Sequence, residues 1–324
     1  MRRLLLWLGA AALAGLLTAP AAAGDGPLYV VQGGGGVESL AHPGLHYVTI
    51  SDGQSSTLLE SINAGSGQVY SWTRLAGSWG IPTIGNGYLN GEGLSRDGRT
   101  LVLATTGGPF SSPSEFLVVD TRQMRVVRTI TLRGGFSFDA LSPDASRMYL
   151  IQYRYASSGD VSDYIVRGYD MRTNRLLPGK IADRREHEED MSGYAMTRAT
   201  SADGRWVYTL YQKPNGGPFV HALDTVRGVA HCIDLPPNKA LYSIVLSLRD
   251  EGRTLAAHYR DGRPWLNVST SSWQISYPGS GFPWAWTGAG IGGGLALLAV
   301  AALVLRRRRG QEVHERARQE LGLA

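Results

Sequence analysis

The sequence predicts an all-β protein, with a β-propeller ectodomain of about five blades followed by one C-terminal transmembrane α-helix. Three observations lead to this prediction. One turn-and-strand pattern recurs four times between residues 94 and 259. Helical periodicity is nearly absent between residues 25 and 282, and an uncharged apolar stretch near the C-terminus ends in four arginines. Repeats built from short strands at such spacing are typical of propellers.

The chain begins with the pattern of a secretory signal peptide. Two arginines follow Met1, residues 4–17 form a short apolar core, and three alanines at 21–23 provide small residues for cleavage. We therefore assign residues 1–23 to a signal peptide. The alternative is a first transmembrane helix, which is disfavoured because the apolar run is short and Pro20 follows it.

Residues 24–282 form the predicted extracytoplasmic propeller, and four segments within it share one pattern. Each has a Ser, then an Asp or Gly turn, then an Arg, and then a run of β-branched, aliphatic or aromatic residues. An Asp-Gly pair between apolar runs is a strong hairpin signal. The segments are residues 94–106, 141–153, 200–212 and 246–259. When the copies are aligned on their Arg, successive copies are 48, 58 and 48 residues apart. These arginines are Arg99, Arg147, Arg205 and Arg253.

In the first three copies, a third strand follows and closes in an aspartate, at Asp120, Asp170 and Asp224. A polar turn and a fourth strand come next, as in residues 125–132. Four short strands per repeat describe a propeller blade. At about 50 residues per blade the ectodomain holds five blades, or six if the degenerate stretch before residue 90 hides one. A strand near Tyr29 would then close the ring by pairing with the last blade.

These turns and strand ends resemble the repeats of the YVTN and WD-like propeller superfamily of bacterial surface and periplasmic proteins. The resemblance lies in the Ser-Pro-Asp-Ala and Ser-Ala-Asp-Gly turns and in the Val-Val-Asp-Thr and Ala-Leu-Asp-Thr strand ends. It covers about residues 90 to 270 and, more weakly, 28 to 90. It implies a propeller of a bacterial secreted or membrane-anchored protein. It implies no catalytic residues, because that superfamily includes lactonases, scaffolds and ligand-binding domains.

The C-terminal part of the chain predicts a membrane anchor at residues 283–305. Trp284 to Leu305 is 22 residues without a charge, and such a helix is roughly 33 Å long, enough to cross the hydrocarbon core. Arginines after it hold the short basic tail, residues 306–324, in the cytoplasm. They are Arg306, Arg307, Arg308 and Arg309. We therefore expect a single-pass type I protein of the cell membrane. Glycines four apart in the helix have the spacing that permits helix-mediated self-association, and the alternative is an ordinary Gly- and Ala-rich span.

The net charge argues against nucleic acid as a partner. The formal charge is +5. Arg2 and Arg3 contribute +2, and the tail from residue 306 adds +3 because it holds six arginines and three glutamates. The region between is therefore formally neutral and lacks the positive surface that a polyanion needs.

A binding rim is predicted six and seven positions after the arginines of the last three copies. An even offset places residues on the same side of a strand, so tyrosines there should occupy equivalent places in successive blades. The expected rim consists of Tyr153, Arg154, Tyr211, Gln212, Tyr259 and Arg260. Amphipathic rings beside hydrogen-bonding side chains suit a recognition surface. The alternative is that the rings fill the wedge between neighbouring blades.

The sequence assigns no catalytic residue, no metal site and no cofactor. It contains no Gly-x-Ser-x-Gly elbow, phosphate loop or paired-cysteine site. The single cysteine, Cys232, is expected to be a small buried hydrophobe. The acidic run at 186–190 is interpreted as a solvated loop, with cation binding as the alternative. We expect a non-enzymatic, membrane-anchored propeller that binds a protein or envelope component on the outer face of the membrane. The alternative is a membrane-tethered lactonase-like or other hydrolytic propeller enzyme with a site at the central channel mouth.

Overall fold

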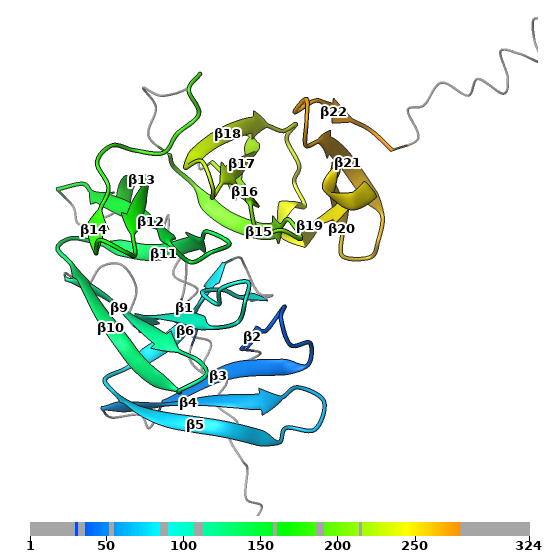
Figure 1. Ribbon diagram of the computed structural model, residues 1–324. Coiled ribbons are helices and arrows are strands. Elements are labelled where there is room, and N and C mark those ends of the chain that lie inside the picture. Colours follow the sequence, from blue (N-terminus) through cyan, green and yellow to red (C-terminus); the bar gives the residue numbers. More distant parts are fainter. Residues whose placement is uncertain are drawn as a thin grey trace, which may run out of the picture. The chain divides into compact units, whose positions relative to one another are not determined.

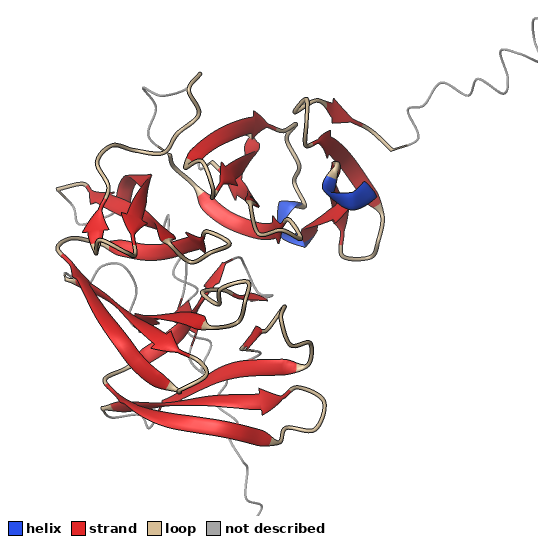
Figure 2. Ribbon diagram, in the orientation of Figure 1, coloured by secondary structure: helices blue, strands red, loops and turns tan. Residues whose placement is uncertain are grey.

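The computed structural model describes most of residues 30–278, and within that part the all-β prediction is confirmed (Figures 1 and 2). The residues described are 30–31, 36–51, 55–84, 90–106, 113–157, 161–185, 191–213 and 216–278. The helical segments among them are two short 3-10 turns, η1 (Leu241–Ser243) and η2 (Asp250–Gly252).

Five antiparallel sheets contain the described strands. Sheet 1 consists of β2 (Val37–Glu38), β3 (Leu45–Ser51), β4 (Ser56–Asn63) and β5 (Val69–Ala76). Sheet 2 consists of β6 (Trp79–Ile84), β8 (Thr100–Thr105), β9 (Ser114–Asp120) and β10 (Arg125–Leu132), with the short β1 (Val30–Val31) and β7 (Asn90–Gly91) paired to β6. Sheet 3 consists of β11 (Phe136–Leu141), β12 (Arg147–Tyr155), β13 (Val161–Asp170) and β14 (Arg175–Leu176). Sheet 4 consists of β15 (Tyr194–Thr200), β16 (Trp206–Gln212), β17 (Pro218–Asp224) and β18 (Val229–Asp234). Sheet 5 consists of β19 (Ile244–Arg249), β20 (Thr254–Tyr259), β21 (Pro264–Ser269) and β22 (Ile275–Ser276).

The strand order within the sheets follows the repeat pattern of the sequence. Four strands run antiparallel in chain order in sheets 1, 3, 4 and 5, and the predicted third strands do end at Asp120, Asp170 and Asp224. The degenerate front end forms sheet 1 by itself. The prediction of about five blades therefore agrees with the five sheets among the described residues.

Alternation along each strand explains how consecutive sheets pack on one another. Successive side chains of a strand point to opposite faces of its sheet. In β8, Leu101 and Leu103 pack with the residues of sheet 1, whereas Val102 and Ala104 pack with those of sheet 3. All four are buried. A fully buried Leu contributes about 1.5–3 kcal/mol relative to an exposed one, so the interfaces between sheets hold the fold together.

The hypothesis that an N-terminal strand near Tyr29 pairs with the last blade is wrong. β1 pairs antiparallel with β6 of sheet 2, with Val30 opposite Pro82 and Val31 opposite Ile81. Sheet 5 draws all four of its strands from residues 244–276. Among the described residues, no strand is shared between the first and last sheets.

The alignment of the repeats on their arginines is wrong in one copy. A backbone hydrogen bond from the residue after the third strand marks the equivalent position in each sheet. In sheets 2, 4 and 5 the acceptor is the carbonyl of Arg99, Arg205 or Arg253, but in sheet 3 it is the carbonyl of Ser146. Arg147 therefore lies one position later. Gln152, and not Tyr153, occupies the place equivalent to Tyr211 and Tyr259.

The predicted signal peptide and the predicted transmembrane helix lie outside the described residues. The chain divides into two units, residues 1–275 and residues 276–324, and the fold above belongs to the first. Among the residues that the structure describes, none of the helices has the length and apolar character needed to span a membrane.

Candidate functional site

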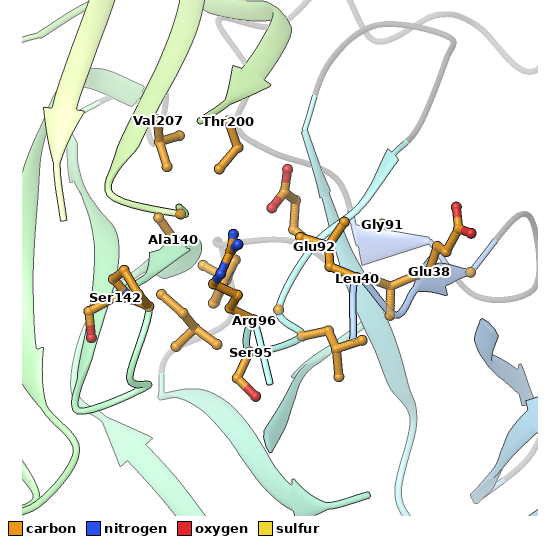
Figure 3. Close-up of a pocket in the computed structure, with 18 of the residues that line it drawn as sticks. Glu38, Leu40, Gly91, Glu92, Ser95, Arg96, Ala140, Ser142, Thr200 and Val207 are labelled. Carbon is orange, nitrogen blue, oxygen red and sulfur yellow. The ribbon is translucent and has the colours of Figure 1, made fainter. Parts of the chain in front are cut away.

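Four of the five sheets contribute to one cavity of about 470 Å³ (Figure 3). Its wall comes from the segments 36–40 in sheet 1, 91–96 in sheet 2, 138–143 in sheet 3 and 200–207 in sheet 4, together with His46. The apolar part of the wall includes Val37, Leu40, Leu94, Phe138, Pro143 and Val207. This volume lies within the range of small-molecule sites, which combine apolar walls with a few polar groups.

Three equivalent turns position this wall. In each turn a serine hydroxyl donates to the aspartate two residues later and accepts from the backbone N–H five residues later. The Oγ–Oδ1 distances are 2.7 Å for Ser95–Asp97, 2.7 Å for Ser142–Asp144 and 2.6 Å for Ser201–Asp203. The backbone N–H groups that each serine accepts from belong to Thr100, Arg147 and Trp206. Because side-chain and backbone groups satisfy one another locally, the turns hold a fixed shape.

Ionisable residues stand three positions before each of these serines, at Glu92, Asp139 and Arg198. Arg198 and Asp139 form an ion pair between their side chains, which are 5% and 3% exposed. Arg198 also donates from Nε to Thr209 Oγ1 at 2.9 Å and from Nη1 to the Asp139 carbonyl. The pair lies in a low-dielectric site where its charges are worth more than at the surface.

Glu92 is the third member of this group and lines the cavity. Burial raises the pKa of its carboxyl above the usual value. The positive charge of Arg198 opposes that rise, and the negative charge of Asp139 adds to it. Within the part of the chain that the structure describes, the Glu92 side chain makes no hydrogen bond and no ion pair within 4.0 Å. A half-buried carboxyl with an altered pKa in a cavity marks a candidate functional residue.

Arg96 lies on the first turn and brings a positive charge to the same cavity. Its side chain crosses toward sheet 4, where Cδ is 3.9 Å from the position that a Cβ on Gly204 would take. The Arg96 guanidinium and the Glu92 carboxyl both project into the space at the centre of Figure 3. Among the described residues they form no ion pair with each other. By contrast, Glu38 is 3.7 Å from its partner His46.

The structure places two of the predicted rim tyrosines in a buried aromatic cluster. Tyr153 is 5% exposed and Tyr211 is 2% exposed, and the ring of Tyr164 lies between them with its centroid 6.0 Å from each. Tyr153 shares a 2.8 Å hydrogen bond with Ser137, and Tyr211 stacks on Phe219 at 5.2 Å. These two rings therefore pack between β-sheets, as the alternative interpretation described.

The other predicted rim residues are more open and have partners of their own. Arg154 pairs with Asp163 at 3.6 Å, and Gln212 donates to two backbone carbonyls of its own loop. Tyr259 is half-buried beneath the guanidinium of Arg263, at 4.6 Å from the ring centroid, and Arg260 contacts the Tyr242 carbonyl. A recognition role for these six residues stays a prediction.

Sequence reasoning missed Glu92 and Arg96. The signal that could have found Glu92 was positional: a charged residue recurs three positions before the turn serine, inside short segments that hold no other charge. An alignment of the repeats on their turn serines reveals this recurrence, whereas the alignment on the arginines hides it.

Other predictions can be placed or fall outside the described residues. The acidic run at 186–190 and the arginines at 306–309 are outside them. Cys232 is half-buried rather than buried, with its Sγ 3.8 Å from His221 Nδ1. In the part of the chain that the structure describes, no cluster of three or more His, Cys, Asp or Glu residues could hold a metal ion.

Comparison with solved structures finds propeller proteins at low sequence identity. The β-propeller domain of Myceliophteria thermophila Cps50 (Swd1) is 12% identical over 78% of this chain and 73% of its own, with a TM-score of 0.44. TolB from Acinetobacter baumannii is 12% identical over 77% of this chain and 56% of its own, with a TM-score of 0.43. No protein-family model and no curated protein matches the chain. The predicted resemblance to propeller repeats is confirmed for the fold alone, and similarity at this level carries no argument about what the chain binds.

Proposed function

We propose that this chain is a non-enzymatic, single-pass membrane-anchored propeller that binds a protein or envelope component on the outer face of the cell membrane. The observation that carries the proposal is the cavity between four sheets, in which the carboxyl of Glu92 and the guanidinium of Arg96 stand among apolar side chains and form no ion pair with each other among the described residues. Recognition sites combine apolar walls with a few polar groups that fix orientation. The anchor rests on the sequence of residues 283–309.

Crosslinking in living cells tests this proposal. Tagged full-length protein is crosslinked and purified beside a version that ends before Trp284. We expect both forms to capture the same partner, and only the full-length form to sediment with membranes. A partner that is lost with the truncation would instead move the interaction to the helix and tail.

A cavity-filling variant makes the test specific. Thr200→Trp places a large ring at the cavity wall, whereas Thr173→Trp places the same ring on an exposed turn outside it. We expect Thr200→Trp to reduce capture of the partner and Thr173→Trp to leave it unchanged. Equal capture by both variants would remove the cavity from the proposal.

The hydrolytic alternative is favoured by one observation, the raised pKa of Glu92. A carboxyl of that kind in a cavity suits general acid or base catalysis, which typically contributes 10²–10⁴-fold to a rate. Purified protein is assayed for hydrolysis of lactones and esters beside Glu92→Gln. Turnover that falls on the order of 100-fold in the variant would support the enzyme. Equal background rates would argue against it.

A further inference from the structure

We propose that the cavity binds a small zwitterion, a molecule with an ammonium group and a carboxylate joined by an apolar part, as in an amino acid or a short peptide. The inference rests on the proposed function because it uses the same cavity. It adds the chemical class of the group that enters.

The wall around Glu92 holds more acidic than basic side chains. Two carboxyls, Glu92 and Asp139, face one guanidinium, that of Arg198. Arg198 already donates to the Asp139 carboxylate, the Asp139 carbonyl and Thr209. These bonds use three of its five N–H donors, and none of the three goes to Glu92. An ammonium group that enters the cavity would supply the missing positive charge and donate hydrogen bonds to a carboxyl that has none from described residues.

The same segment also brings the complementary charge to the cavity. Arg96 presents a planar guanidinium, whose fork of donors matches the two oxygens of a carboxylate. Its Cδ lies 3.9 Å from the position that a Cβ on Gly204 would take, and its head projects into the cavity (Figure 3). The nearby Glu38 accepts from the Gly44 N–H and pairs with His46, which leaves it less free to compete for the guanidinium.

We assign the ammonium and the carboxylate to one ligand because Glu92 and Arg96 are close in the chain and form no ion pair with each other among the described residues. Glu92 and Arg96 are four residues apart, which limits the separation of their Cα atoms to about 14 Å. A single small molecule can therefore reach both. Leu40, Leu94 and Val207 line the same cavity and suit an apolar middle part. A purely anionic ligand would meet the negative wall at Glu92, and a purely cationic one would leave Arg96 unused.

Calorimetric titration of the full-length protein in detergent tests the inference with four forms of one probe. Leucyl-leucine carries both charges, its N-acetyl derivative only the carboxylate, its amide only the ammonium, and the N-acetyl amide neither. We expect leucyl-leucine to bind on the order of tenfold more tightly than any other form, since each charge-assisted contact is worth at least that much.

Two variants assign each charge to its residue. Glu92→Gln should abolish the preference for the free amino group over the N-acetyl form, and Arg96→Gln should abolish the preference for the free carboxylate over the amide. Arg99→Gln is the matched control, because Arg99 lies on the same turn, pairs with Asp97 and does not line the cavity. It should leave all four affinities unchanged. Thermal unfolding of each variant confirms that it is folded. Because Arg96 lies on an exposed turn, Arg96→Gln should disturb the fold less than Glu92→Gln.

The outcomes separate this inference from the proposed function. Equal binding of the four forms, blocked by Thr200→Trp, would overturn the zwitterion and leave the cavity as a binding site. Absence of binding by all four forms would also overturn it, and crosslinking of the cellular partner then decides the proposed function by itself. Tighter binding of leucyl-leucine that neither Glu92→Gln nor Arg96→Gln affects would place the zwitterion elsewhere and overturn the assignment.

Discussion

The two ends of the β12 and β16 strands differ in how the space beside them is filled. At one end, Tyr153, Tyr164 and Tyr211 are buried and pack against one another. At the other end, the turns of sheets 2, 3 and 4 surround an open cavity that holds Glu92 and Arg96. Aromatic rings fill the space at the aromatic end, whereas the cavity end stays open, and there Glu92 and Arg96 form no ion pair with each other among the described residues.

This contrast shows that repetition alone does not identify a binding surface. The tyrosines stand out in the sequence because they are large and regularly spaced, but such residues also suit the wedge between two sheets. The Glu92 carboxyl, which has no ion-pair partner among the described residues, is costly for the fold in its ionised form, since burial penalises ionised groups. A site that holds such groups has a reason other than stability, and this points to the cavity end as the functional one.

Removal of a ring at the aromatic end should have the largest effect. Tyr211→Ala deletes a side chain that is 2% exposed, and we expect a loss of about 3–5 kcal/mol in the free energy of unfolding. Tyr242→Ala is the matched control, because that ring is 65% exposed, and it should cost less than about 0.5 kcal/mol. Urea unfolding of both variants measures this. If Tyr211→Ala left stability unchanged and abolished partner binding, the result would contradict a packing role and support the predicted binding rim.

Acid should weaken the aromatic end through His221, which lies 6.4 Å from the Tyr211 ring. Burial lowers the pKa of His221 to about 4; Asp139 and Asp183 oppose this shift, and Arg198 adds to it. A lowered pKa in the folded state means that the stabilising effect is complete above pH 6.5 and is lost as the pH falls toward 4. The loss is on the order of 3 kcal/mol. We expect wild type to lose more stability than His221→Leu between pH 7 and pH 4, whereas parallel curves would contradict the assignment.

The cavity end should show the opposite sign through Glu92. Its pKa is raised in the folded state. The protonated form is therefore favoured in the fold, and stability falls as the pH rises through that pKa. We expect Glu92→Gln to be more stable than wild type at pH 7 and to lose this advantage near pH 4. Thermal unfolding at the two pH values measures it. A variant that is less stable at pH 7 would mean that the ionised carboxyl stabilises the fold.

The sequence predicted the sheets well and the site poorly, for physical reasons. Local turn chemistry determines the repeats, since Ser201 and Asp203 satisfy each other within one turn. Glu92, Asp139 and Arg198 meet only because three sheets pack together, and no local pattern specifies that contact. The alignment on arginines failed at Arg147 because this Arg stands one position after Ser146, the residue that occupies the equivalent place in sheet 3. β1 was assigned to the wrong sheet because two residues carry too little pattern to choose a partner.

The central claim is that the cavity end, and not the aromatic end or an outer strand, meets the partner. Site-specific photo-crosslinking of the full-length protein in cells tests it most directly. A photoreactive residue replaces Arg96 at the cavity in one version and Val127, which is 49% exposed on the outermost strand β10, in the other. The account predicts a discrete crosslinked product from position 96 that Thr200→Trp suppresses, and none from position 127. The same product from position 127, or a product from position 96 that Thr200→Trp leaves unchanged, would contradict it.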